Sequence, residues 1–385
     1  MNPTKKISIL AAFPLHHLET FGERFRPAGH YATWLPQIAE AWGDQSDFEI
    51  HWLVMSELVQ KRTDVVQWQQ SFHVLPTTRS GRASTLFRAD RKAIASILDE
   101  IQPDLVHGWG TEDVYGLAAA LSKRPNIVSM QGILSFYVLK NRMAWRSYLQ
   151  AAIELFVLWK AHQITTESEW GRQIVKKRNP WAQVAIVEYG VQKVFFETKW
   201  SPNEKKPLAI FVGSISPRKG IQDLVAAFSE PRLAACELVV VGEGEGRWAE
   251  ELQRSAPSNV RWEGRKTAQE TAKLMAKAWC LVLPTRADTS PNVVKEARVI
   301  GLPIVASPHG GHIQYVEDEA NGFICDLGAP EDWSRAIRYL IDDISRAKHM
   351  GQIDQDKHRE LLRPARTARN FLNLYEHILV THRTN

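Results

Sequence analysis

The sequence lacks any apolar run long enough to cross a lipid bilayer. A membrane-spanning helix needs about 18–20 consecutive apolar residues, and the nearest candidate, residues 151–158, is short and contains Glu154. Cysteine is also scarce: the 385 residues include three, Cys236, Cys280 and Cys325, which lie far apart. Their odd number and wide spacing exclude a disulfide framework and a Cys-x-x-Cys metal site. They favour a reducing, cytoplasmic compartment.

The N-terminus has only part of a secretory signal. Two lysines precede the apolar residues 7–15, but His16, His17 and Glu19 follow where the small residues of a cleavage site are expected. We therefore interpret this segment as a first buried β-strand.

Low-complexity tracts and repeats of solenoid length are absent as well. Hydrophobic residues make up 44% of the chain and charged residues 24%, which is typical of a globular, enzyme-like protein. A chain of 385 residues is too long for one ordinary core, so two domains are expected.

The net charge of +5 is concentrated in the first half, where residues 1–200 hold 23 basic and 19 acidic side chains, a difference of +4. Two basic clusters contain interleaved aromatic side chains: Arg79, Arg82, Phe87, Arg88, Arg91 and Lys92, and then Lys140, Arg142, Trp145, Arg146 and Tyr148. Such clusters are usually solvated faces, and the alternative is a peripheral contact with an anionic membrane, at its inner face, or with an acidic acceptor. No recognition motif accompanies the charge, so we expect no nucleic-acid partner.

Apolar segments of strand length alternate with helical stretches along the whole chain, which favours an α/β fold with parallel sheets. The expected strands are residues 7–13, 48–55, 72–76, 105–108, 126–130, 163–166, 184–188, 208–215, 237–242, 260–263, 280–283, 303–307 and 322–325.

A polar, proline-containing stretch at 196–207 reads as an interdomain linker. The sequence thus predicts two doubly wound Rossmann-like domains facing a cleft. Residues 1–200 form the N-terminal domain, which a C-terminal helix in 365–385 completes, and residues 201–364 form the C-terminal domain. In open α/β sheets, ligands bind beyond the carboxyl ends of the strands.

The strongest group of candidate site residues follows the strand predicted at 280–283. Ser290 is a good N-cap and Pro291 suits the first helical position, so a helix is expected to begin there, with free amides at Asn292 and Val293. Asp288 precedes this helix start and Glu296 lies inside the helix. Two carboxylates beside an anion-binding helix start suit a ligand with a central phosphate and hydroxyl groups at both ends. The alternative is a capped surface helix with two solvated acids.

Two glycine-containing turns follow other strands. In the first, Gly213 and Ser214 lead to Arg218 and Lys219 at a helix start, where a cation has no favourable interaction with the helix dipole unless an anion binds there. It is not a P-loop, because Arg218 stands at the position of the second glycine. In the second, Gly242 and Gly244 form part of a dinucleotide fingerprint that Arg247 interrupts.

The order of these motifs resembles the retaining GT-B glycosyltransferases of the family 4 type over residues 208–345. The matching positions are Lys219-Gly220, Gly242 and Gly244, the acidic pair Asp288 and Glu296, then Ala297, Gly301, Pro303, Val305 and Ala306, and finally Gly310-Gly311 and Asn321-Gly322. The first half matches more loosely, at Gly29 and His30, at Asp104 and His107, and at the segment 188–191. The last helix is similar to the one that in this family crosses back onto the N-terminal domain.

The resemblance implies transfer of a sugar from a nucleotide-sugar, a UDP- or GDP-linked co-substrate, to a glycan or lipid-linked acceptor with retention of configuration. The resemblance also implies a role in bacterial surface-polysaccharide biosynthesis. By resemblance, Glu296 holds the ribose, Asp288 contacts the donor sugar and Arg218 or Lys219 neutralises the diphosphate. The remaining donor contacts would come from Gly29, Gly213, Ser214, Gly242, Gly244, Arg265, Lys266, Ser290, Pro291, Asn292 and Val293.

Three positions depart from the family pattern. Asp288 replaces the usual glutamate, Ser214 stands where many members have a phosphate-binding arginine, and Gln131 stands where many have a histidine near the reacting sugar. Gln131 can position a substrate but cannot carry a proton. Ser214 and Gln131 favour the alternative of a catalytically idle nucleotide-sugar-binding subunit. A second alternative is a nucleotide-sugar epimerase or hydrolase on the same fold, which would need no acceptor.

We expect neither a cofactor nor a metal. The two histidines His309 and His312 lack a third ligand, and Asp354 and Asp356 lie in a polar helical stretch rather than at a strand end.

Overall fold

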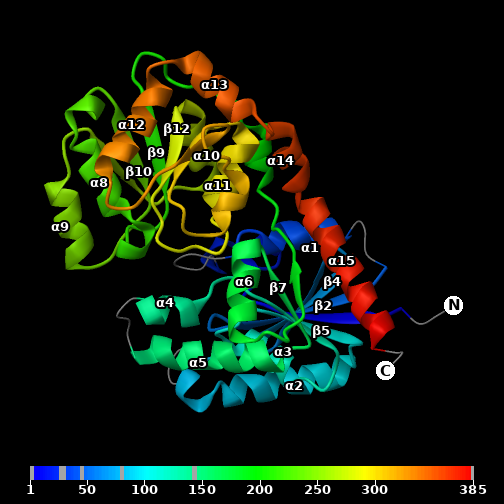
Figure 1. The fold of residues 1–385 in the computed structure, drawn as a ribbon. Coiled ribbons are helices and arrows are strands. Elements are labelled where there is room, and N and C mark those ends of the chain that lie inside the picture. Colours follow the sequence, from blue (N-terminus) through cyan, green and yellow to red (C-terminus); the bar gives the residue numbers. More distant parts are fainter. Residues whose placement is uncertain (1–3, 26–31, 44–46, 79–81, 141–144, 383–385) are drawn as a thin grey trace. The chain divides into compact units, whose positions relative to one another are not determined.

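The computed structural model describes residues 4–25, 32–43, 47–78, 82–140 and 145–382 (Figure 1). The chain divides into two compact units, Met1–Gly190 with Pro364–Asn385, and Val191–Arg363. Each unit is a Rossmann-like α/β structure, as the sequence predicts. None of the described helices is both long and apolar enough to span a membrane.

The first unit contains eight strands and seven α-helices among its described residues. The strands are β1 (Lys6–Leu10), β2 (Glu49–Ser56), β3 (Thr63–Gln67), β4 (Gln70–Pro76), β5 (Leu105–Trp109), β6 (Asn126–Ser129), β7 (Gln163–Thr166) and β8 (Val184–Ile186). The α-helices are α1 (Leu35–Gly43), α2 (Arg88–Ile101), α3 (Val114–Ala120), α4 (Leu134–Lys140), α5 (Trp145–Lys160), α6 (Glu169–Arg178) and, from the end of the chain, α15 (Pro364–Thr381), with short 3₁₀ turns between elements.

The second unit contains six strands and begins with a helix. The strands are β9 (Leu208–Val212), β10 (Glu237–Val241), β11 (Val260–Gly264), β12 (Cys280–Leu283), β13 (Ile304–Ala306) and β14 (Gly322–Ile324). The helices are α7 (Lys193–Glu197), α8 (Ile221–Phe228), α9 (Arg247–Ser255), α10 (Ala268–Lys277), α11 (Asn292–Ile300), α12 (Pro330–Ile341), α13 (Ile344–Gln352) and α14 (Gln355–Leu361).

The first sheet has the order β3-β4-β2-β1-β5-β6-β7-β8 and is parallel except at one edge. The prediction missed the edge strand β3, which pairs antiparallel with β4. Trp68 and Gln69 form the hairpin turn with φ angles of 48° and 57°. This turn type usually carries Asn-Gly or Asp-Gly, so its sequence gives no signal of a hairpin.

Successive residues of the central strands face opposite sides of this sheet. Ile9 and Trp52 point into a core shared with α1 and α15, whereas Leu10 and Leu53 point into a core shared with α2, α3 and α5. The unit is therefore a sheet between two helical layers, and its strands are apolar on both faces.

Helix α15 belongs to the first unit although it ends the chain. It confirms the predicted terminal helix, and its Tyr375 hydroxyl lies 2.7 Å from Nδ1 of the buried His107. Burial lowers the pKa of His107 to about 3, so this histidine is a neutral hydrogen-bonding group of the core. Trp42 of α1 adds a second link by donating to the Ala368 carbonyl at 3.0 Å.

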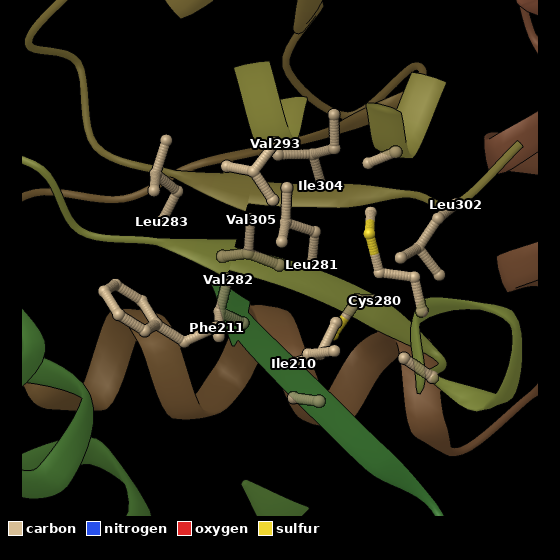
Figure 2. Packing of buried hydrophobic residues seen from close by; sticks show 14 of the residues in the cluster. Ile210, Phe211, Cys280, Leu281, Val282, Leu283, Val293, Leu302, Ile304 and Val305 are labelled. Carbon is tan, nitrogen blue, oxygen red and sulfur yellow. The ribbon is translucent and has the colours of Figure 1, made fainter. Parts of the chain in front are cut away.

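The second sheet has the order β11-β10-β9-β12-β13-β14 with all pairs parallel, and its six strands were all predicted. Figure 2 shows side chains of β9, β12 and β13 packed together with Val293 of α11. Residues such as Ile210, Leu281 and Ile304 are fully buried. This core fixes the strand ends from which the candidate site residues project.

The division between the units lies earlier than the expected boundary at residue 200. Val191 and Phe195 are buried in the core of the second unit, so residues from 191 onward pack there and not in the first unit. The stretch predicted as a linker, 196–207, lies within the second unit. The return to the first unit occurs between Arg363 and Pro364.

Candidate active site

The candidate site of the second unit lies where the strand order reverses. Strands β9 and β12 are neighbours, and the chain continues from β9 to β10 on one side and from β12 to β13 on the other. Loops that follow β9 and β12 therefore diverge, which leaves a crevice at the carboxyl ends of these strands. Arg218 and Lys219 follow β9, and Asp288 follows β12.

Gly220 holds these two loops against each other. It has a φ angle of +71°, and a Cβ atom added here would lie 1.9 Å from the Pro284 carbonyl oxygen. The Arg286 amide donates to the Arg218 carbonyl at 2.8 Å, which joins the same loops. Only glycine allows this approach, and the approach is what brings Lys219 to Asp288.

A compact group of charges results. The Lys219 ammonium donates to Oδ2 of Asp288, and an Arg218 guanidinium nitrogen lies 3.7 Å from the same oxygen. Burial alone would raise the pKa of Asp288, but the charges of Lys219 and Arg218 outweigh it and lower this pKa. Asp288 is therefore ionised, and the three predicted residues do lie together.

The start of α11 differs from the prediction. The helix begins at Asn292, Pro291 is its N-cap and makes no side-chain hydrogen bond, and Ser290 lies outside the helix. The expected Ser290 cap is therefore wrong. Proline at the N-cap fits, because its φ angle of −67° lies in its fixed range and the first turn needs no amide from it. The Ser290 hydroxyl is buried and has no hydrogen-bond partner among the described residues.

Glu296 lies in the second turn of α11 and is partly exposed. Burial raises the pKa of its carboxyl group to about 7, against a smaller opposing effect of Lys295. Within the described part of the chain, this carboxyl group has no hydrogen-bond or ion-pair partner. A half-ionised carboxyl without a partner is a feature of binding and catalytic sites.

His312 is a site residue that the sequence reasoning missed, because it was considered only as one half of a metal pair with His309. Its Nε2 lies 2.7 Å from the Ser307 carbonyl, so Nε2 carries the proton. Its Nδ1 is buried without a partner among the described residues. Burial lowers the pKa of His312, against the opposing effects of Ser307 and Asp288, which leaves a neutral ring with a bare acceptor.

The turn before His312 contacts the backbone of Asp288. Gly311 donates its amide to the Asp288 carbonyl at 2.9 Å, and a Cβ on Gly310 would lie 2.6 Å from that oxygen. No group of three or more His, Cys, Asp and Glu side chains that could hold a metal ion occurs among the described residues.

The glycines after β9 and β10 pack two loops together. A Cβ on Gly242 would lie 1.9 Å from the Gly213 carbonyl oxygen, and one on Gly244 would lie 2.5 Å from the Ile215 carbonyl oxygen. Ser214, in the same turn, is exposed.

The loop after β11 carries two more predicted donor contacts. Arg265 lies 3.6 Å from a carboxylate oxygen of Glu243, and Lys266 lies 2.9 Å from one of Glu263. Arg265 and Lys266 directly follow β11, so they lie at the same carboxyl-terminal end of the parallel sheet as the loops after β9 and β12.

The remaining candidates belong to the first unit. Gln131 follows β6 and is partly exposed, and its side chain has no hydrogen-bond partner among the described residues. The helix α4 that follows has its first two amides bound by the buried carboxylate of Glu154, at 2.8 and 2.9 Å. Gly29 lies outside the described residues, as does His30.

The first predicted basic cluster is not an open aromatic patch. Phe87 is buried in the core, and Arg82 pairs with the buried Asp90 at 2.6 Å. Arg88 and Lys92 are exposed, whereas Arg79 lies outside the described residues. Phe87 was therefore wrongly assigned to a surface.

Comparison with known families matches both units. The family described as "Glycosyl transferases group 1" matches residues 193–357, and "Glycosyl transferase 4-like" matches residues 34–168. A GDP-mannose-dependent alpha-mannosyltransferase of Corynebacterium glutamicum is 25% identical over 65% of this chain and 62% of its own length, so the chain spans about three-fifths of that relative. The lipopolysaccharide core biosynthesis glycosyltransferase LpsE of Rhizobium meliloti is 28% identical over 36% of this chain and 41% of its own.

Solved structures share the fold over nearly the whole chain. Sucrose-phosphate synthase from Thermosynechococcus elongatus superposes with a TM-score of 0.78 at 16% identity, covering 98% of this chain and 100% of that one. Anabaena HepE in complex with UDP-glucose gives a TM-score of 0.72 at 16% identity, covering 97% and 99%. The fold, the strand-end motifs and the family matches to both units show that the chain belongs to the GT-B glycosyltransferases of the group 1 type.

Proposed function

We propose that the protein transfers a sugar from a nucleotide-sugar donor to an acceptor with retention of configuration. One observation carries the proposal: at the strand-order reversal, the Lys219–Asp288 ion pair lies among polar atoms that have no partner within the described chain. These atoms are the Ser290 hydroxyl and Nδ1 of His312. Buried polar groups are nearly always hydrogen-bonded, so these atoms call for a ligand that is rich in hydroxyl groups.

Each group has a matching part of a nucleotide-sugar. Glu296 accepts hydrogen bonds from the two ribose hydroxyls, and Lys219 with Arg218 neutralises the diphosphate. Asp288 can keep Lys219 on Oδ2 while its Oδ1 accepts from the donor sugar. The uncapped start of α11 supplies amides and the positive end of a helix dipole.

The chemical step breaks the bond between the sugar and the diphosphate, so negative charge grows on the leaving group. Two cations and a helix start that are in place beforehand stabilise this charge without reorganisation. We therefore propose that no divalent metal is needed. Gln131, which cannot carry a proton, would position the reacting sugar.

The substrate class is a UDP- or GDP-linked sugar, with a glycan or lipid-linked glycan as acceptor. The names of the relatives, a GDP-mannose-dependent mannosyltransferase and a lipopolysaccharide core glycosyltransferase, support a role in bacterial surface-polysaccharide biosynthesis. All three cysteines are free, buried thiols, which supports a reducing compartment, and we propose the cytoplasm.

The test is release of nucleoside diphosphate from a panel of UDP- and GDP-sugars, with and without acceptor extracts from bacterial envelopes. A transferase releases nucleotide only when acceptor is present, and the product keeps the anomeric configuration of the donor. Equal release without acceptor would indicate a hydrolase, and conversion of the sugar without release an epimerase. Donor binding without turnover against any acceptor would indicate an idle subunit.

A further inference from the structure

The described surface has one concentration of exposed apolar side chains. Sixteen large hydrophobic side chains are exposed among the described residues, and seven of them lie between residues 139 and 181. Three tryptophans dominate: Trp145 is 66% exposed, Trp159 56% and Trp181 75%. The other four members are Leu139, Tyr148, Leu155 and Phe156. We call these seven residues the aromatic face.

Helix α5 supplies most of this face in a regular pattern. Its exposed apolar residues are Trp145, Tyr148, Ala152, Leu155, Phe156 and Trp159. At about 100° per residue, these six positions fall within an arc of roughly 100°, along about 20 Å of helix. The arc is a continuous stripe and not a scatter of single side chains, which distinguishes it from ordinary surface hydrophobics.

The inner side of α5 is fixed firmly, so the stripe is held outward. Glu154 projects from the opposite side of the helix, is fully buried, and accepts from the first two amides of α4. Val157 and Leu158 are also fully buried. Helix α4 lies beside α5 (Figure 1). Trp181 extends the stripe, because its ring centroid lies 5.8 Å from that of Trp159.

The exposed charged residues of α5 itself have one sign. The exposed residues of α5 include Arg146 and Lys160 but no acid, since its one carboxylate, Glu154, is buried. Lys177, near Trp181 in the sequence, is also exposed. A helix with aromatic and aliphatic side chains on one face and basic residues at its edge is typical of binding in the plane of a lipid interface.

We infer that the aromatic face is a binding surface for an anionic lipid bilayer, on which α5 lies in the plane of the headgroups. A second copy of the chain fits less well. In a two-fold pair each face meets itself, so Arg146 and Lys160 would lie among basic residues of the other copy, whereas anionic headgroups oppose them with the complementary charge. The basic cluster around Phe87 was also expected as a membrane contact. The surface that we infer consists instead of residues of α5 and Trp181. It stands independently of the transferase activity.

The test is flotation of the full chain with vesicles, without nucleotide. We expect binding to phosphatidylcholine vesicles that contain about 30% phosphatidylglycerol and a large loss of binding at about 0.5 M salt. The double variant W145A/W159A should bind about 10-fold more weakly or worse, because it removes the main interfacial anchors. W248A is the matched control: Trp248 is 37% exposed on α9, outside the aromatic face, and its variant should bind as the parent does.

A second variant separates charge from apolar contact. R146E/K160E keeps the aromatic side chains and should lose binding to anionic vesicles by a comparable factor. Melting curves of all variants should match the parent, since the replaced side chains are exposed. Failure of the parent to float at low salt would overturn the inference, as would unchanged flotation of W145A/W159A. Light scattering that shows a dimer which W145A/W159A dissociates would assign the face to a second copy instead.

Discussion

At the scale of single residues, the binding role that we propose for Glu296 comes with a cost in stability. Its pKa of about 7 in the folded protein is above the value of 4.5 for an unperturbed glutamate. A raised pKa means that the folded state holds this proton more tightly than the unfolded state. The stability associated with the proton is complete below about pH 4.5 and is lost as the pH rises through about 7.

Glu296→Gln removes the ionisation and should therefore stabilise the free protein at alkaline pH. The difference in unfolding free energy should be near zero at about pH 4.5 and reach about 1–2 kcal/mol at about pH 8, after allowance for partial exposure. Denaturant unfolding at several pH values measures it. A variant no more stable than the parent at alkaline pH would show that the carboxyl group is not strained when ionised.

The same substitution should weaken nucleotide binding. Hydrogen bonds to a charged acceptor contribute about 1.5–3 kcal/mol each, so the loss of ribose contacts should reduce affinity for UDP or GDP by about 10-fold or more. Calorimetry at about pH 8 checks this, and the gain in stability at that pH excludes unfolding as the cause. Undiminished affinity would mean that Glu296 does not contact the ribose.

Substitution of Lys219 tests which group neutralises the negative charge on the departing diphosphate. If Lys219 stabilises the charge of the departing diphosphate, Lys219→Ala should lower kcat by about 10²–10³-fold, and turnover of the parent should persist in excess EDTA. Loss of the Asp288 ion pair is a second effect, so Lys219→Arg, which retains a cation, is the control. Activity that vanishes in EDTA and returns with Mg²⁺ or Mn²⁺ would show that these cations do not carry the charge.

At this scale the sequence predicted residues better than their roles. The sequence selected Arg218, Lys219 and Asp288 as separate candidates that the family resemblance assigned to one donor. They lie together because β9 and β12, which precede them, are neighbouring parallel strands. Ser290 was misassigned because a serine before a proline satisfies the capping rules, yet Pro291 took the cap. His312 was missed because only the fold reveals that its ring is buried with one nitrogen bare.

At the scale of elements, the loops at the strand ends depend on backbone contacts that leave no room for a side chain. Gly242 has a φ angle of +142°, and a Cβ would lie 1.9 Å from the Gly213 carbonyl oxygen. Gly246 also has a positive φ angle, +83°, but nothing lies within 4 Å of its Cβ position. Both glycines have a positive φ angle that other residues rarely adopt, but only at Gly242 would a Cβ atom overlap with neighbouring atoms.

Gly242→Ala should therefore destabilise the second unit more than Gly246→Ala does. Conformational strain costs about 1–3 kcal/mol at each, and the overlap at Gly242 must in addition separate the β9 and β10 loops. We expect a larger fall in melting temperature and weaker nucleotide binding for Gly242→Ala alone. Equal effects of the two substitutions would show that backbone strain alone causes the loss of stability and that the contact between the β9 and β10 loops does not contribute.

Elements also show where periodicity is an adequate guide. The six strands of the second sheet, which are three to five residues long, were predicted from short, mostly apolar segments, and the terminal helix from an apolar stripe at helical spacing. Strand β3 was not, since it alternates exposed and half-buried residues at a sheet edge and turns through Trp68 and Gln69. The stripe on α5 was hidden for a different reason: an exposed and a buried apolar face look the same in sequence.

At the scale of the whole molecule, none of the buried hydrophobic clusters among the described residues is shared between the two units. The core of the second unit contains buried residues between Val191 and Leu362 alone. The core on one face of the first sheet contains Phe371, Leu372 and Tyr375 of α15 together with residues of α1 and the strands. The first unit is therefore discontinuous in sequence, and the second is continuous.

We therefore expect the continuous second unit to fold as an isolated fragment and the N-terminal part of the first unit to need α15. Residues 191–363 should unfold cooperatively as an isolated protein and bind UDP or GDP, because Lys219, Asp288 and Glu296 all lie in this fragment. Nucleotide at about 100 times its Kd should add about 2.7 kcal/mol to its stability. Residues 1–190 should not fold alone, because they lack α15, and addition of a 364–385 peptide should restore a cooperative transition. A fragment 1–190 that melts cooperatively without the peptide would show that α15 is an accessory to the first core. A folded fragment 191–363 that binds no nucleotide would show that residues of the second unit are insufficient for donor binding.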